Sequence, residues 1–193
     1  GHAVSAYYLE NSDPVHQVSI IPRGMAGGYT LYRPKEDSSH MLRSAMIDSI
    51  VMSMGGRVAE KIVFGDISTG ASQDISHATD TARSMVTRYG MSDLLGPVVY
   101  GKDNDEVFLG MDYNHTKNYS DAYATQIDDE VKRILCTCFE KCENILTEHR
   151  DKLDMIAEKL IADFGMDTSQ QTRQFHSPLE KNAEQFPDRE RFC

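Results

Sequence analysis

The sequence predicts a mainly α-helical protein with a small β-sheet. From about position 38 onward, apolar residues recur three or four positions apart, which is the spacing of one face of an α-helix. Before that point, two short runs of β-branched and aromatic residues are bounded by glycine and proline, as short strands are. The 193 residues, 40% of them hydrophobic, are enough for one domain with a sizeable core.

The first part of the chain predicts a short helix followed by two strands. Residues 1–9 place apolar side chains on one helical face and lead into the turn-forming residues 11–14. The segments VHQVSIIPRG and GGYTLYRP then each contain a short β-forming run that is ended by proline. These two runs are expected to form a small sheet or hairpin.

A long helix is predicted next, from about residue 42 to residue 62, with the preceding serines as N-cap candidates. It contains Gly55 and Gly56, each of which costs about 1 kcal/mol relative to alanine inside a helix. We therefore expect another part of the chain to pack closely there, where only a bare backbone fits.

Three more helices complete the prediction. One helix begins near Ser72 and stops before Gly90, a residue typical of helix C-termini. A long helix from about Ser120 is expected to break near residues 149–151 and to lead into a last helix. Beyond residue 165 the apolar content falls sharply. Residues 1–164 are therefore predicted to form the domain, and residues 165–193 a disordered tail.

Charge and composition exclude several classes of function. The formal charge of −10 argues against binding nucleic acid, whose phosphates need basic surfaces. No apolar run approaches the roughly 18 residues that a membrane-spanning helix needs. The segment GPVVYGKD, which begins at Gly96, nearly matches the phosphate-binding pattern G-x4-G-K-[ST]. Its last position holds Asp103, which repels phosphate where a hydroxyl must bind Mg²⁺, so we exclude nucleotide binding there.

His2 and Asp74 are the candidate metal ligands. A histidine at the start of a helix is a weak signal alone, but His2 fits the second histidine of H-E-x-x-H, whose two histidines face one metal ion. That pattern needs a third ligand from elsewhere, and Asp74 in STGASQD stands in the first turn of a later helix. The alternative for Asp74 is a favourable interaction with the helix dipole.

Glu60 and His77 are weaker candidates. Glu60 either forms a hydrogen bond near the metal site, stays on the surface, or pairs with Lys61 or Arg57 on its own helix. His77 lies one turn after Asp74, and that spacing makes it a candidate to face the same site.

Many segments together resemble the peptidase domain of the FtsH family, peptidase family M41. The resemblance covers about residues 1–162, in family order, through the segments GHAV, DPVHQVSIIPRG, GGYTLYRP, MGGRVAEKIVFGDISTGASQDISHAT, ARSMVTRYGMSDLLGPVVYG, EVFLG, NYSDAYATQIDDEV and ILTEHRDKLDMIAEKL. It implies an FtsH-type metallopeptidase fold and a zinc-dependent endopeptidase that belongs to an ATP-dependent membrane protease degrading unfolded or membrane proteins.

The resemblance also implies roles for the candidate ligands. The active-site helix of that family carries H-E-x-G-H, so His2 becomes the second zinc histidine. Asp74, in GASQD where the family usually has GASND, becomes the third protein ligand. The first zinc histidine and the general-base glutamate are then expected just before Gly1, so this chain is expected to be inactive as it stands. The alternative is a non-catalytic homologue that acts as a ring-assembly or scaffold module.

Cofactors, partners and location follow from the same resemblance. It implies Zn²⁺ as the cofactor, with ATP acting only through an AAA domain that is absent from this chain. The full-length protein is expected to be a homo-hexamer anchored in a bacterial inner membrane, facing the cytoplasm, or in an organelle, whereas these 193 residues are expected to be soluble. Polypeptides are the implied substrates, and nucleic acid is not a partner.

A strand is the candidate substrate-binding element. Val18, Ser19, Ile20 and Ile21 are expected to align an extended polypeptide through main-chain hydrogen bonds at a sheet edge. The alternative is an ordinary structural strand, since sheet edges are common without ligands.

Overall fold

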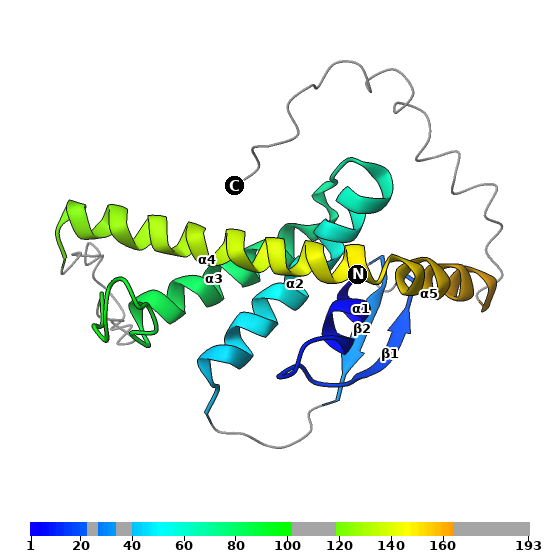
Figure 1. Cartoon of the computed structure of the whole chain (residues 1–193), viewed down its shortest axis with the longest axis horizontal. Helices are drawn as coiled ribbons and strands as arrows, with labels where there is room; N and C mark the ends of the chain where they lie inside the picture. Colours follow the sequence, from blue (N-terminus) through cyan, green and yellow to red (C-terminus); the bar gives the residue numbers. More distant parts are fainter. Residues whose placement is uncertain (23–26, 34–39, 102–118, 164–193) are drawn as a thin grey trace, which may run out of the picture.

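The computed structural model describes residues 1–22, 27–33, 40–101 and 119–163. It confirms a mainly helical fold with a two-stranded sheet (Figure 1). In chain order the elements are α1 (His2–Tyr7), β1 (Val15–Ser19), β2 (Tyr29–Tyr32), α2 (Arg43–Phe64), the 3₁₀ helix η1 (Thr69–Ala71), α3 (Ser72–Thr87), α4 (Asp121–Glu148) and α5 (Arg150–Asp163). The predicted tail 165–193, the serines at 38 and 39, and Asp103 lie outside the described residues.

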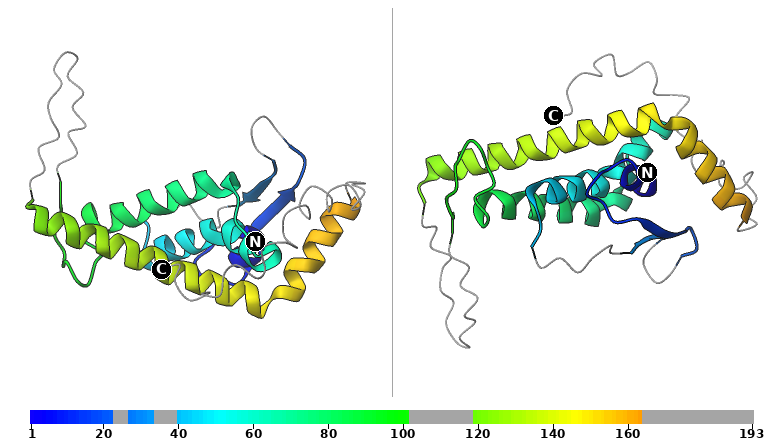
Figure 2. Two further views of the ribbon diagram at one scale, coloured as in Figure 1. Left: turned by 90° about the horizontal axis from the view of Figure 1, so that it is seen from above. Right: turned by 60° about the horizontal axis from the view of Figure 1, so that its bottom comes forward.

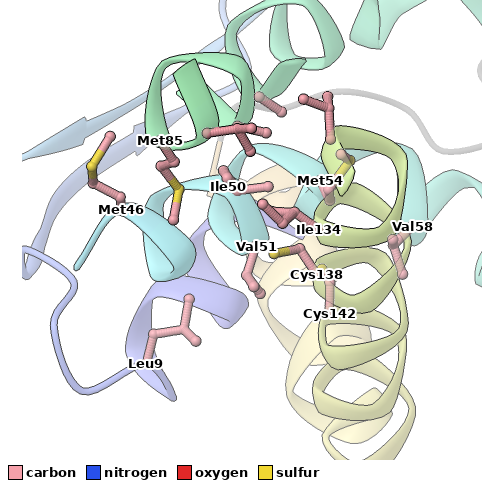
Figure 3. Close-up of a cluster of buried hydrophobic side chains, with 14 of the residues drawn as sticks. Leu9, Met46, Ile50, Val51, Met54, Val58, Met85, Ile134, Cys138 and Cys142 are labelled. Carbon is pink, nitrogen blue, oxygen red and sulfur yellow. The ribbon is translucent and has the colours of Figure 1, made fainter. Parts of the chain in front are cut away.

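Helices α2, α3 and α4 pack against one another and enclose the core, and α1 packs on α2. Figure 1 shows α4 running along the length of the molecule beside α2 and α3, while the views in Figure 2 show α5 turning away from it. The close-up in Figure 3 shows the side chains that meet in the core: Leu9, Met46, Ile50, Val51, Met54, Val58, Met85, Ile134, Cys138 and Cys142. Fully burying one such aliphatic side chain contributes about 1.5–3 kcal/mol.

Strands β1 and β2 form the predicted antiparallel hairpin. Val18 pairs with Thr30 and Ser19 with Tyr29, and the register is irregular between Val15 and Gln17. Within the described part of the chain each strand pairs only with the other, so both outer edges of the hairpin lack a strand partner there.

The predicted helix break near residue 149 is a tight corner between α4 and α5. Arg150 donates from Nη1 to the backbone carbonyl of Ile62, 3.2 Å away in the last turn of α2. The ring of His149 stacks on Tyr8, with ring centroids 3.6 Å apart. The corner is therefore tied both to α2 and to the residue that follows α1.

The predictions for the ends of α2 and α3 have different outcomes. The prediction that a serine caps α2 is wrong, because Leu42 occupies the N-cap position and no side chain caps the helix. Helix α3 ends at Thr87, and Gly90 has the positive φ of 58° expected of a residue that terminates a helix. None of the helices in the described ranges combines the length and the apolar character needed to cross a bilayer.

Candidate metal centre

Helices α1 and α2 cross in backbone contact, because glycines stand at the crossing point. A Cβ atom on Gly55 would lie 2.7 Å from the backbone nitrogen of His2, and one on Gly1 would lie 1.9 Å from the carbonyl oxygen of Gly55. A Cβ on Gly56 would lie 2.8 Å from Nε2 of His2. The close approach predicted for the glycine pair is confirmed. It places the His2 ring against the backbone of α2 at Gly56.

A main-chain hydrogen bond fixes the protonation pattern of that ring. Nδ1 of His2 lies 2.8 Å from the carbonyl oxygen of Met52. A carbonyl oxygen only accepts hydrogen bonds, so Nδ1 must carry the hydrogen and donate it. In the neutral imidazole Nε2 then presents its lone pair, which is the form in which histidine binds metal ions.

Asp74, the second candidate ligand, lies in the first turn of α3. The preceding loop is held to α2 by Glu60, whose carboxylate accepts hydrogen bonds from the backbone nitrogen (3.0 Å) and the hydroxyl (2.5 Å) of Ser68. The Ser68 hydroxyl in turn accepts from the backbone nitrogen of Gly70 and caps η1. This capped turn leads directly into α3.

The two candidate ligands meet. Nε2 of His2 and Oδ2 of Asp74 are 3.4 Å apart, and their side chains are 30% and 41% exposed. With a neutral imidazole both atoms are acceptors, so attraction between them requires a cation, either a proton or a metal ion. Two ligands about 2.0–2.1 Å from a tetrahedral zinc ion are separated by about 3.3–3.4 Å, so the pair fits zinc.

Among the described residues, no third candidate ligand joins His2 and Asp74. Within the described ranges there is no group of three or more His, Cys, Asp or Glu side chains able to hold a metal ion. His77 is exposed on the helix that carries Asp74 and is not part of such a group.

The interpretation of Glu60 as the ion-pair partner of Lys61 or Arg57 is wrong. The Lys61 ammonium lies 2.8 Å from Glu143 on α4 and sits over the Phe139 ring. The buried Nε of Arg57 has no hydrogen-bond partner in the described part of the chain. The carboxylate of Glu60 instead holds the loop that leads to Asp74, which helical spacing alone does not indicate.

The sequence reasoning missed Tyr32, at the end of β2. Burial raises the pKa of Tyr32 to about 12, and the negative charge of Asp74 adds to that increase. This interaction brings β2 within electrostatic reach of the candidate metal ligands, with the phenol protonated at neutral pH. The available signal was the alternation of the strand, which assigns Tyr32 and Thr30 to one face.

The candidate substrate-binding residues span the end of β1. Val18 and Ser19 belong to the strand, and Ile20 and Ile21 follow it. Ser19 is buried, whereas Ile21 is 46% exposed. The backbone nitrogen of Ile21 donates to the Ser19 hydroxyl at 3.2 Å, so that amide already has a partner within the chain.

A surface pocket among the described residues lies elsewhere. It has a volume of about 540 Å³ and lies between the end of α1 and the start of α2. Its charged groups include Asp48, which pairs with Lys141, and Arg43, which pairs with Asp93. Neither His2 nor Asp74 lines it, so the candidate metal ligands and this pocket are separate features.

Comparison with known proteins assigns the family. The model of peptidase family M41 matches residues 1–173. The chain belongs to peptidase family M41. Since M41 proteins are the FtsH-type peptidases, the resemblance found in the sequence is confirmed, and the helical fold with its small sheet is the M41 peptidase fold.

Characterised M41 proteins match most of this chain. It is 53% identical over 161 residues to the ATP-dependent zinc metalloprotease FtsH 1 of Thermoanaerobacter sp. (strain X514). This alignment covers 83% of the chain and 26% of that relative. The FtsH of Bacillus subtilis (strain 168) is 47% identical over 88% of the chain, and that of Thermotoga maritima 43% identical over 95%. These alignments cover 27% and 30% of those two relatives, so the chain spans less than a third of their length.

Proposed function

We propose that this chain is the zinc-dependent endopeptidase domain of an ATP-dependent protease, with His2 and Asp74 as two of its three zinc ligands. The observation that carries the proposal is the approach of His2 Nε2 to Asp74 Oδ2 at 3.4 Å, with Nδ1 engaged by the Met52 carbonyl. Membership of a family whose named members are zinc metalloproteases supports the same reading.

The residues of the chain have distinct tasks in peptide-bond hydrolysis. Zinc, when bound, polarises the scissile carbonyl and lowers the pKa of a water molecule. His2 contributes a neutral nitrogen ligand, oriented by its bond to Met52. Asp74 contributes a carboxylate oxygen from the end of α3 whose helix dipole favours negative charge. The partial exposure of both side chains leaves room for a substrate to reach the site.

The third zinc ligand and the general base are proposed to be the His-Glu pair of an H-E-x-G-H pattern that ends at His2. Residues 1–193 contain no such pair ahead of His2. On their own they are therefore expected to bind zinc weakly and to leave peptide bonds intact, because three protein ligands and a base are the usual requirement.

Substrate alignment is proposed to occur at an edge of the hairpin that has no strand partner among the described residues, with Val18, Ser19, Ile20 and Ile21 as the candidate segment. An extended polypeptide that adds to a sheet edge is held mainly by its own main chain, so selectivity for its side chains is low. Such weak selectivity suits unfolded or membrane proteins as substrates. Peptides in which successive backbone amides are N-methylated are expected to be poor substrates, and undiminished cleavage of them would remove this part of the proposal.

The remaining properties concern the whole protein. The proposal includes an AAA domain of the same chain that uses ATP, assembly as a homo-hexamer, and anchorage in a membrane. Its support is that the three relatives are named ATP-dependent zinc metalloproteases, and this chain spans 26–30% of their length.

The test uses the full-length natural protein. Its zinc content and its cleavage of casein are measured with and without a chelator, beside an Asp74→Asn variant. We expect stoichiometric zinc, chelator-sensitive cleavage, and loss of both in the variant with the helical circular dichroism unchanged. A protein that holds no zinc and cuts nothing, and that carries other residues in place of the His-Glu pair, would instead be the scaffold homologue.

A further inference from the structure

We infer that Glu60 and Ser68 are positioning residues that fix Asp74 in its metal-binding place, an inference that rests on the proposed zinc site. Glu60 stands near the end of α2, and both of its carboxylate oxygens are engaged by Ser68. Hydrogen bonds to an ionised carboxylate are about twice as strong as those between neutral groups. This double contact closes the loop between α2 and α3.

Burial does little to hold this loop. Every residue from 63 to 70 is exposed, including the apolar Phe64 and Ile67. The first well-buried residue after the turn is Ala71, which is 5% exposed. The contact between Glu60 and Ser68 therefore supplies a restraint that packing does not supply until η1 ends.

The restraint passes from Ser68 to Asp74 through helical backbone. The Ser68 hydroxyl accepts from Gly70 nitrogen at 3.1 Å, and this fixes the start of η1. Helix η1 continues without a break into α3, where Asp74 is in the first turn. Because consecutive helical turns are stiff, a shift at Ser68 moves the Asp74 carboxylate relative to His2.

This role differs from that of a ligand. The contacts of Glu60 are with the loop, and Asp74 itself faces His2. Removing Glu60 therefore leaves both candidate ligand side chains in the protein, but the distance between them is no longer fixed. In metal sites, loss of a group that hydrogen-bonds a ligand directly lowers metal affinity about 10- to 100-fold, and we take this range as the scale for a group that holds the loop of a ligand.

The experiment compares four variants of the full-length natural protein. Glu60→Ala removes the acceptor, and Ser68→Ala removes the hydroxyl that links Glu60 to Gly70. Ser68→Thr keeps that hydroxyl and serves as the conservative rescue. Glu143→Gln is the matched control, because it breaks the ion pair of the adjacent Lys61 without touching the loop. Zinc affinity, hydrogen exchange of residues 65–76, and casein cleavage at limiting and excess zinc are measured.

Glu60→Ala and Ser68→Ala are expected to weaken zinc binding about 10- to 100-fold and to speed hydrogen exchange in the loop. Excess zinc is expected to restore most of the cleavage, since the ligands themselves remain. Ser68→Thr and Glu143→Gln are expected to bind zinc with an affinity within about twofold of that of the unmodified protein. This change is far smaller than the one expected for the two alanine variants.

Zinc affinities within twofold of the unmodified protein for both alanine variants would overturn the inference. So would a loss that excess zinc fails to restore in Ser68→Ala while its circular dichroism is unchanged. If Glu60→Ala does not fold, the comparison of Ser68→Ala with Ser68→Thr decides the question alone. Failure of the proposed function is distinguishable, because the unmodified protein would then bind no zinc.

Discussion

The two candidate ligands are held in opposite ways. His2 lies in what we call the His2 arm, residues 1–11, which is fixed by close packing of α1 on α2 across Gly55. Asp74 lies in what we call the Asp74 arm, residues 65–74, which is fixed mainly by polar contacts of Glu60 and Ser68 on an exposed surface. Packing resists displacement but tolerates no added atom, whereas a polar tether tolerates added atoms and depends on single hydrogen bonds.

This difference gives the two arms of the candidate metal site different structural roles. The His2 arm is part of the core, since Val4 and Leu9 are buried with the residues of α2 and α4. The Asp74 arm is peripheral, and its geometry is adjustable without unfolding the domain. Disturbance of the first arm should therefore appear as lost stability, and disturbance of the second as lost metal binding.

The largest effect is expected from Gly55→Ala, which disrupts the packing of the His2 arm on α2. The new Cβ would lie 2.7 Å from the backbone nitrogen of His2, an atom that cannot move without moving α1. We expect a loss of about 3 kcal/mol in the free energy of unfolding, measured by urea denaturation. Gly27→Ala is the control, because its Cβ would meet nothing within 4 Å. Equal stability of the two variants would contradict the packed crossing.

A smaller loss is expected when the polar anchor of the His2 arm is removed. Asp48 accepts hydrogen bonds from Asn11 at 2.9 Å and from Lys141 at 2.8 Å. Asp48→Ala leaves those donors without their acceptor, and we expect a loss of about 2 kcal/mol. Thermal unfolding at neutral pH measures it, and a variant as stable as the parent would show that the anchor does not matter.

The same anchor predicts sensitivity to acid. Burial opposes ionisation of Asp48, but hydrogen bonds from Lys141 and Asn11 outweigh it and hold the pKa of the carboxyl below its usual 3.8. A carboxyl with a depressed pKa stabilises the fold fully above its unfolded value, and the stabilisation is lost as pH falls through the folded value. Stability should therefore fall below about pH 4, with a gentler slope in Asp48→Asn. Identical slopes would exclude Asp48 as the source.

Gly56→Ala is the exception within the His2 arm, because it disturbs the His2 side chain and leaves the packed backbone in place. Its Cβ would lie 2.8 Å from Nε2 of His2, the tip of a side chain that is able to rotate. The helix gains about 1 kcal/mol from alanine, so stability should change little while zinc affinity of the full-length protein falls about tenfold. A large loss of stability with unchanged zinc affinity would reverse this assignment.

The smallest effect is expected from a contact that supports neither arm. Arg83 on α3 pairs with Asp128 on α4 at 3.0 Å, and both side chains are largely exposed. Asp128→Asn is expected to change the free energy of unfolding by less than about 1 kcal/mol. This variant sets the scale of an ordinary surface change, and a value near that of Gly55→Ala would invalidate the comparison.

The sequence predicts the packed arm well and the polar arm poorly. Apolar periodicity places α2, α3 and α4, and two adjacent glycines inside a helix have few explanations other than a close crossing. The partner of Glu60 is a loop hydroxyl eight residues away, and no spacing rule identifies it. Likewise Tyr32 comes within electrostatic reach of Asp74 only because the hairpin folds beside α1. Tertiary contacts between polar groups leave no periodic signal in a chain.

The acceptor that selects the imidazole tautomer is a main-chain carbonyl, that of Met52. Replacing the side chain at that position exchanges a thioether for another group but cannot delete the oxygen. Whatever side chain stands at position 52, the carbonyl keeps a hydrogen on Nδ1 while the helix is intact, so in the neutral imidazole Nε2 carries the lone pair. The tautomer that suits His2 as a candidate metal ligand is thus set by the backbone of α2, and a side-chain substitution at position 52 does not remove it.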